Sequence, residues 1–381
     1  MKHLTETSTY PDGENVKIKE EIYDQLVDKT TGQSSPVWKI KWENSNNVSV
    51  EVITYGATIT SIRIPDKNGV CEDVVMGFKD LKGYQDPLNP YFGATVGRVA
   101  NRIGNSKFTI NGVTYGVSAN LGPHQLHGGF KGFDKVNWKH VIKGTKVTMS
   151  YLSKDNEEGY PGDLITNLSF QLTDSNEFLI DFKSYTTKPT FVNLTNHSYF
   201  NLAGHNKGAE ELYKHAISIN ADQTTDVDKD SIPSGKLLPV GGTIFDLRIP
   251  RILGEVIHKI PGYDGYDHNF CVTKGEFQGD SFVARVHHPG SGRVLEVYSN
   301  QPGVQFYTSN GIPQNPKEFK GNPKDLQTLK GKDGAYYKHG ALCLETQNYP
   351  DAINHPGFPK AVLNPGEVYH HTLIYKFSVE K

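Results

Sequence analysis

The sequence has almost no net charge, because 40 Lys and Arg residues are balanced by 42 Asp and Glu residues to give a formal charge of −2. Proteins that bind nucleic acids or membrane surfaces need a surplus of basic residues, and no surplus occurs in total or in any long run. We therefore expect neither a nucleic-acid partner nor a membrane partner. A small or uncharged substrate fits this charge balance better.

Long apolar runs and paired cysteines are also missing. No stretch reaches the roughly 20 apolar residues that a membrane-spanning helix needs, and residues 1–21 carry no apolar run of the kind that marks a secretory signal. Cys71, Cys271 and Cys343 are odd in number and far apart, which argues against a disulfide framework and fits a reducing compartment. These absences predict a cytoplasmic protein.

Helix-like segments are few and short, whereas alternation with a period of two residues dominates the chain from Val37 onward. The pair Asn111-Gly112 within residues 107–115 is a strong hairpin signal, and a second hairpin is expected around Lys143-Gly144 within 138–152. Together with 38 Gly and 21 Pro, the pattern predicts an all-β fold: a large antiparallel β-sandwich with few short helices. Further strands are expected at residues 164–172, 177–185, 212–220, 281–287, 293–299 and 368–379.

Two parts of the chain differ from the rest in composition. Residues 1–35 are polar and lack a steady period, so we expect an N-terminal extension on or beside the main body, and one hypothesis is that it covers a sheet edge. Residues 36–381 contain no linker and no repeat of roughly 20–50 residues, which predicts a single β-sandwich domain rather than a propeller. Residues 311–338, rich in Lys, Gly, Pro and Asn, are expected to form a surface loop.

Side chains that can carry chemistry gather in five segments, where ionisable or amide residues adjoin Gly or aromatic residues. Polar residues on loops of a rigid scaffold are typical of functional sites. Planar polar groups bind sugar hydroxyls and aromatic rings pack on sugar CH faces, so this mixture favours a carbohydrate ligand. The segments are GRVANRIG at 97–104, HQLHGG at 124–129, NLTNHSYFN at 193–201, YDGYDHN at 263–269 and LETQN at 344–348.

Several of these residues have simpler interpretations. Asn101 and Arg102 could lie in a Gly-flanked turn with a surface ion pair, although a phosphate-binding loop is excluded because no Gly-Lys-Ser/Thr follows. His124 and His127 could hold Zn²⁺ with a distant carboxylate, but the two glycines that follow break the helical register of such a pair. We therefore expect no metal site.

Other polar residues have equally ordinary alternatives. The amides of residues 193–201 could form turns, and Asp267 could be a solvated carboxylate. Glu345 is less ordinary, because it follows the apolar run ALCL and so lies at the end of a buried strand. In each of the pairs His287-His288 and His370-His371 at most one ring can face a given site, and we expect both pairs at the surface.

Six motifs occur in one order over about residues 36–380: GRVANRIG, HQLHGG, NLTNHSYFNLAG, GYDHNF, QPGVQFYTSN and ETQNYPDAIN. In this combination the sequence resembles the aldose 1-epimerase (galactose mutarotase) family. The resemblance implies a single-domain β-supersandwich with an open sugar-binding cleft, and interconversion of the α and β anomers of aldohexoses such as galactose and glucose. It implies neither a cofactor nor a metal.

The resemblance also assigns roles to residues at the matching motif positions. The catalytic acid falls on His197 and the catalytic base on Glu345. The chain departs from the family at His124, where relatives often have Asn, and at Tyr349, where some have Trp, so the preferred aldose stays open. The sugar-binding positions fall on Asn101, Arg102, His127, Ser198, Tyr199, Asp267 and Gln305.

Three other functions fit these residues less well. A glycosidase needs two carboxylates at the scissile bond, whereas one member of this pair is a histidine. A non-catalytic sugar-binding module needs neither His197 nor Glu345, and a hexose-6-phosphate epimerase of similar fold would want more basic residues at the cleft than Arg102. The expected partner is therefore a small monosaccharide, and the expected assembly is a monomer or a weak homodimer.

Overall fold

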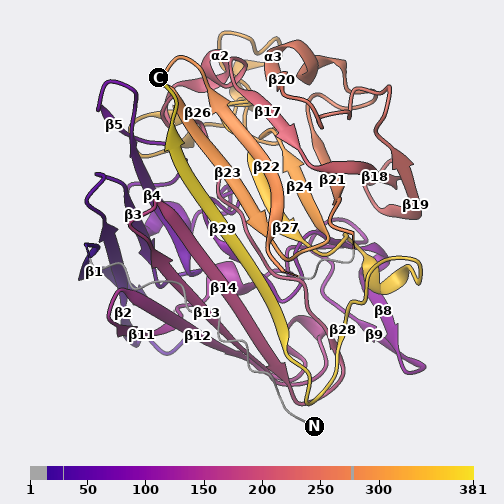
Figure 1. Cartoon of the computed structure of the whole chain (residues 1–381). Helices are drawn as coiled ribbons and strands as arrows, with labels where there is room; N and C mark the ends of the chain where they lie inside the picture. Colours follow the sequence, from indigo (N-terminus) through magenta and orange to yellow (C-terminus); the bar gives the residue numbers. More distant parts are fainter. Residues whose placement is uncertain (1–14, 29, 276–278) are drawn as a thin grey trace.

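Antiparallel β-strands dominate the computed structural model, which describes residues 15–28, 30–275 and 279–381 (Figure 1). The largest sheet has nine strands, with the C-terminal strand β29 at its centre. In sheet order these strands are β11 (Lys139–Lys143), β12 (Lys146–Ser153), β13 (Leu164–Leu172), β14 (Glu177–Thr186), β29 (Tyr369–Val379), β23 (Arg293–Ser299), β22 (Ser281–His288), β17 (Ala216–Ile219) and β20 (Arg251–Ile252).

Two five-stranded sheets accompany the large one. The first is formed by β1 (Lys17–Val27), β2 (Ser34–Glu43), β3 (Ser49–Ile53), β4 (Thr58–Pro65) and β5 (Cys71–Asp73). The second has the order β19 (Pro233–Pro239), β18 (Ala221–Val227), β21 (Asp267–Val272), β24 (Gly303–Tyr307) and β27 (Cys343–Gln347).

Short elements connect these sheets. Two-stranded ladders pair β6 (Thr95–Val96) with β16 (Thr195–Asn196), β7 (Arg102–Ile103) with β10 (Gln125–Leu126), β8 (Lys107–Ile110) with β9 (Val113–Gly116), β15 (Thr190–Phe191) with β28 (Val362–Leu363), and β25 (Leu329–Lys330) with β26 (Ala335–Tyr336). The helices are α1 (Leu81–Tyr84), α2 (Gly208–Leu212), α3 (Leu253–Val256) and the 3₁₀ turns η1 (Gly104–Ser106), η2 (Phe133–Lys135), η3 (Glu157–Gly159), η4 (Ile257–Lys259), η5 (Pro323–Asp325) and η6 (Ala352–Asn354). Within the described ranges, no helix is both long enough and apolar enough to span a membrane.

The main hydrophobic core lies between the sheets. Trp42 of β2 packs its ring 5.6 Å from Phe178 of β14 and 6.5 Å from Phe170 of β13, centroid to centroid, which joins the first five-stranded sheet to the large sheet. Phe270 of β21 and Phe306 of β24 belong to the same buried cluster. Inward-facing side chains of paired layers form such a core in a β-sandwich, so the predicted all-β sandwich is confirmed.

Several predicted strands match the structure closely. β13 and β23 coincide with the predicted 164–172 and 293–299, and the turn Asn111-Gly112 separates β8 from β9. The prediction for 212–220 was too long, because Leu212 ends α2 and only Ala216–Ile219 form a strand. The expected surface loop at 311–338 contains the short ladder of β25 and β26.

The N-terminal segment contributes a strand to a sheet. Lys17–Val27 form β1, which pairs antiparallel with β2 from Lys17 to Val27, with a register shift between Ile22 and Asp24, and forms the edge of the five-stranded sheet. The predicted boundary between residues 35 and 36 falls inside β2, which begins at Ser34. Residues 1–14 of the expected extension lie outside the described residues.

Candidate active site

Three neighbouring strands place polar side chains on one face of the second five-stranded sheet. Gln305 of β24 lies directly opposite Glu345 of β27, and Tyr307 lies opposite Asp267 of β21. Directly opposed residues share a face, and so do residues two apart on one strand. Strand pairing therefore brings Asp267, Gln305, Tyr307 and Glu345 together, although they come from segments far apart in the sequence.

A second segment carries His197 to the same place. The backbone N–H of His197 donates to the carbonyl of Ala94, and the N–H of Gly93 donates to the carbonyl of His197, at 2.9 and 3.0 Å. Three residues further on, Phe200 forms an antiparallel bridge with Leu342, with mutual hydrogen bonds of 2.7 and 2.9 Å. Because Leu342 lies three residues before Glu345, this bridge sets the position of His197 relative to Glu345.

His197 and Glu345 face each other in the wall of a cleft of about 510 Å³. The distance from His197 Nε2 to Glu345 Oε2 is 3.6 Å, and their side chains are only 5% and 3% exposed. A larger hollow of about 740 Å³ lies elsewhere, lined by residues such as Val192, Gln301 and Tyr369, and it contains neither member of this pair. The cleft is lined by Pro90, Tyr91, Asn101, Arg102, Leu126, His127, His197, Tyr199, Gly262, Tyr263, Asp264, Asp267, Gln305, Tyr307, Asn310, Gly311 and Glu345.

The carboxylate of Asp267 is held in place by two donors. Gln305 Nε2 donates to one of its oxygens at 2.7 Å, and Arg102 Nη2 lies 3.5 Å from the other. Asn101 has a positive φ of 63°, and its side-chain oxygen accepts the backbone N–H of Arg102 at 2.9 Å. These contacts present fixed hydrogen-bonding groups to the cleft.

The tautomer of His127 follows from one backbone hydrogen bond. The N–H of Asn101 donates to His127 Nδ1 at 3.1 Å, so a neutral ring carries its proton on Nε2. Burial lowers the pKa of His127 well below its ordinary value, which keeps the ring neutral. His127 thus offers the cleft a hydrogen-bond donor.

The ligand atoms of His127, His197 and Glu345 lie within 4.8 Å of one another, a spacing that metal sites share. Metal binding needs a free lone pair on nitrogen, whereas the hydrogen bond from Asn101 leaves Nε2 of His127 protonated. The set therefore suits a hydroxyl ligand better than a cation. His124, considered above as a metal ligand, is absent from the cleft lining, and its Nδ1 accepts the backbone N–H of Asn105 at 3.0 Å.

Burial moves the pKa values of the central pair in opposite directions. It lowers the pKa of His197 to about 3. It raises the pKa of Glu345 well above the ordinary carboxyl range, with a further rise from the Asp267 charge and an opposing effect of Arg102. Because the two groups face each other, they titrate as a pair, and a single shared proton leaves the pair without net charge.

Most of the predicted sugar-binding residues line the cleft, but Ser198 does not. Its buried hydroxyl donates to the side-chain oxygen of Asn196 at 2.6 Å, and Ser198 is absent from the lining. Tyr199 does line the cleft, where its ring stacks on His197 with centroids 4.9 Å apart. Ser198 lies between His197 and Tyr199, which both line the cleft, and its own side chain turns to Asn196 instead.

Sequence reasoning missed several residues that line the cleft. Tyr307 lies inside the QPGVQFYTSN motif, whose alternation with Gln305 could have indicated it. Tyr263 begins the YDGYDHN segment and Asn310 ends the QPGVQFYTSN motif, but neither residue was given a role, and Tyr91 lies outside every quoted segment.

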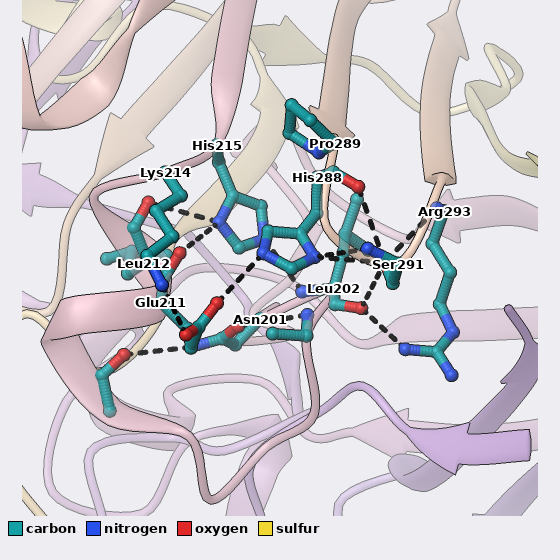
Figure 2. Close-up of polar contacts among 12 residues, drawn as sticks. Asn201, Leu202, Glu211, Leu212, Lys214, His215, His288, Pro289, Ser291 and Arg293 are labelled. Carbon is teal, nitrogen blue, oxygen red and sulfur yellow. Dashed lines mark hydrogen bonds and ion pairs between the residues drawn. The ribbon is translucent and has the colours of Figure 1, made fainter. Parts of the chain in front are cut away.

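A second polar cluster surrounds Leu202, which follows His197 by five residues in the sequence (Figure 2). His288 Nε2 lies 3.1 Å from the carboxylate of Glu211, and His288 Nδ1 accepts the backbone N–H of Ser291 at 3.1 Å. The buried Ser291 hydroxyl is 3.3 Å from the carbonyl of Leu202, which also accepts from Arg293. This cluster holds Leu202 in place. It contains Ser, His and Glu, but the hydroxyl of its serine, Ser291, is buried and already hydrogen-bonded.

Two of the four tandem histidines are buried, contrary to the prediction. His288 and His371 are buried at 4% and 0% exposure, so the expectation that both pairs lie at the surface was wrong for these two. His287 is intermediate and His370 is exposed, as alternation along a strand requires.

Comparisons with known proteins agree with this geometry. The family model described as aldose 1-epimerase matches residues 39–376. Galactose mutarotases from Rattus norvegicus and Homo sapiens are each 47% identical over 336 residues, which make up 88% of this chain and 92% of each relative. The solved structure of the GalM/aldose epimerase homologue from C. elegans is 30% identical, with a TM-score of 0.78, and the match covers 88% of this chain and 97% of that one.

A second solved structure, galactose 1-epimerase from Lactobacillus acidophilus NCFM, shares the fold with a TM-score of 0.76 at 22% identity, over 96% of this chain and 100% of that one. The family match and the 47% identity both extend over most of the chain, and the family match includes the segments that build the cleft. The chain therefore belongs to the aldose 1-epimerase family.

Proposed function

We propose that this aldose 1-epimerase interconverts the α and β anomers of free aldohexoses, with Glu345 as the base and His197 as the acid. One observation carries the assignment of these roles: a carboxyl and an imidazole face each other at 3.6 Å, buried in the wall of a cleft of about 510 Å³. Opening a cyclic hemiacetal needs such a pair, because one group must remove the O1 proton while another protonates O5.

The reaction balances without any other reactant. Glu345 takes the O1 proton as His197 delivers a proton to O5, and the C1–O5 bond breaks to give the open aldehyde. Rotation about C1–C2 by about half a turn presents the other face of the carbonyl. Ring closure then returns the O5 proton to His197 and the Glu345 proton to O1, so both groups regain their starting states.

The pair needs only its single shared proton for this cycle. The reactive form has Glu345 ionised and His197 protonated, whereas burial favours the form in which both are neutral. Arg102 lowers the pKa of Glu345 and so favours the reactive form. Hydrogen bonds from the fixed groups of the cleft to the sugar favour it further.

The substrate-binding roles rest on the same cleft. We assign Asn101, Arg102, His127, Asp267 and Gln305 to sugar hydroxyls, each hydrogen bond contributing on the order of 1–3 kcal/mol. The ring of Tyr199 faces the cleft beside them. Ser198 was also assigned to the sugar by resemblance, but its bond to Asn196 supports an indirect role instead.

Among the described residues that line the cleft, Arg102 is the only Lys or Arg, and it is already paired with Asp267. A phosphorylated hexose would need further cations, so the cleft favours an unphosphorylated sugar. Because the curated relatives are named galactose mutarotases, we propose galactose as a substrate, with glucose as the aldose to compare.

Polarimetry on freshly dissolved α-D-galactose and α-D-glucose tests the proposal. The wild-type chain should accelerate the approach to anomeric equilibrium beyond the buffer rate, and Glu345→Gln and His197→Asn should each abolish the acceleration. The exposed His370→Asn is the matched control and should behave as wild type. A wild-type chain that binds sugar but leaves the buffer rate unchanged would support a binding module instead.

A further inference from the structure

We propose that Tyr91 is a positioning residue for the reaction: its phenol ring orients the imidazole of His197 toward Glu345. The inference rests on the proposed role of His197 as the acid, and it concerns a residue that no sequence motif indicated. Tyr91 lines the cleft, and its ring is nearly parallel to that of His197, with an interplanar angle of 9° and centroids 6.0 Å apart.

His197 needs such an aid because no hydrogen bond from another residue orients its ring at Nδ1. Among the described residues, none other than His197 itself contacts this buried atom with a polar group, and the contact within His197 is to its own backbone. Catalytic and metal-binding histidines usually have this second nitrogen fixed by a carboxylate or carbonyl. In this cleft another force must hold Nε2 opposite Glu345.

Aromatic rings surround the imidazole instead. Tyr199 stacks on it at 4.9 Å with an interplanar angle of 6°, while His127 and Tyr307 meet it edge-on at 5.3 and 6.4 Å. Parallel stacked rings resist rotation of the imidazole away from their parallel planes. Tyr91 and Tyr199 therefore hold the ring orientation of His197 by packing, while its contact with Glu345 sets which nitrogen carries the proton.

The loop that carries Tyr91 is tied to the segment that carries His197. Gly93 donates its backbone N–H to the carbonyl of His197, and the hydroxyl of Tyr199 donates to the carbonyl of Pro90 at 2.8 Å. Tyr91 itself has a φ of 65°, a left-handed conformation that L residues rarely adopt, and the surrounding contacts hold it there. The backbone thus fixes the stacking partner to the acid.

Lys135 lies over the Tyr91 ring and contacts it through a cation–π interaction. Its ammonium lies 5.0 Å from the ring centroid, and its other partner is the carboxylate of Asp134 at 2.7 Å. Tyr91 also meets His127 edge-on at 4.6 Å. Since Tyr91 lines the cleft, the rival role is a platform for the sugar, and the experiment must separate that role from positioning.

The test compares Tyr91→Phe, which keeps the ring, with Tyr91→Leu, which removes it, and uses the exposed Tyr185→Leu as the matched control. We expect Tyr91→Phe and Tyr185→Leu to stay within about twofold of wild type, and Tyr91→Leu to lower kcat by about tenfold or more with little change in KM. A raised KM with an unchanged kcat would identify a sugar platform and overturn the proposal.

A second readout is independent of activity. The imidazole ¹⁵N signals of His197, identified by their loss in His197→Asn, should report one tautomer in the wild type and averaged shifts in Tyr91→Leu. Unchanged signals would overturn the positioning role even if activity fell. If neither Tyr91→Leu nor Tyr91→Met folds, Tyr91 acts in folding and the proposal fails, whereas an active His197→Asn would instead refute the proposed function.

Discussion

At the scale of single residues, the site depends on how many protons its central pair carries. Activity needs one proton shared by His197 and Glu345, because the cycle starts and ends with one donor and one acceptor. A second proton must go to His197, whose pKa burial lowers to about 3, and the shared proton is lost at a Glu345 pKa that burial raises. The pair therefore stays singly protonated over a wide range, and the loss of activity at high pH reports the loss of the proton that the pair shares.

Two charged neighbours should move this alkaline limit in opposite directions. The Asp267 charge raises the pKa of Glu345, so Asp267→Asn should shift the alkaline limb of kcat/KM to lower pH. Arg102 lowers that pKa, so Arg102→Gln should shift the limb to higher pH. Both variants also break the same ion pair and should weaken sugar binding.

Full pH profiles by polarimetry for the two variants and wild type measure the shifts, and His370→Asn serves as the control for a change far from the cleft. Both variants moving the limb in the same direction would mean that the loss of the ion pair, and not the charge on Glu345, governs it.

At the scale of elements, the segment after His197 is fixed by contacts from the large sheet. Arg293 of β23 is 1% exposed and donates to the carbonyls of Ile64, Val70 and Leu202 at 3.0, 2.8 and 2.9 Å. The backbone N–H of Leu202 in turn donates to His215 Nε2 at 2.9 Å, as Figure 2 shows. One side chain thus joins β4, the segment before β5, and the chain that follows the acid.

Replacing Arg293 by Met removes three charge-assisted hydrogen bonds, although the carbonyl of Leu202 keeps its contact with the Ser291 hydroxyl and that of Val70 keeps the backbone N–H of Asp66. A hydrogen bond to a charged group contributes about 1.5–3 kcal/mol, so we expect the free energy of unfolding to fall by about 3 kcal/mol or more. Arg285→Met is the control, since the ion pair of Arg285 with Glu380 is partly exposed to solvent and its loss should cost about 1 kcal/mol or less. Urea unfolding measures both, and equal losses would refute the anchoring role.

The sequence predicted elements better than it predicted the packing between them. Regular alternation located β13 and β23, whereas α2 interrupted the run that had suggested a longer strand. The motifs named His197 and Glu345, but the contact of Tyr91 with His197 arises only when the loop at 89–94 folds against residues more than a hundred positions away. No local pattern records a contact of that kind.

Ser198 and His288 show the same limit for single side chains. Its motif position assigned Ser198 to the sugar, but the Ser198 hydroxyl points to Asn196 and donates a hydrogen bond to the side-chain oxygen of that residue. Tandem position placed His288 at the surface, but pairing within the large sheet buries it against Glu211 and Ser291. The direction of a side chain depends on partners that a single sequence does not name.

At the scale of the whole molecule, β1 separates the edge of a sheet from solvent. It pairs with β2 from Lys17 to Val27, while much of its own surface is exposed, including Ile22 at 55%. Ile18, Tyr23 and Leu26 are its contacts with the buried clusters. An uncovered strand presents a row of free N–H and C=O groups to other chains, so β1 protects β2 more than it builds the core.

A chain that begins at residue 30 should therefore self-associate while keeping its chemistry. Removing β1 bares the edge of β2, whereas Glu345 and Gln305 lie in the other five-stranded sheet and keep their strand partners. We expect light scattering to show aggregation that grows with protein concentration, and polarimetry at low concentration to give a kcat close to that of the full chain. If the shortened chain stayed as soluble as the full chain, β2 would need no cover. If it lost activity while remaining monomeric, β1 would instead support the cleft through the core.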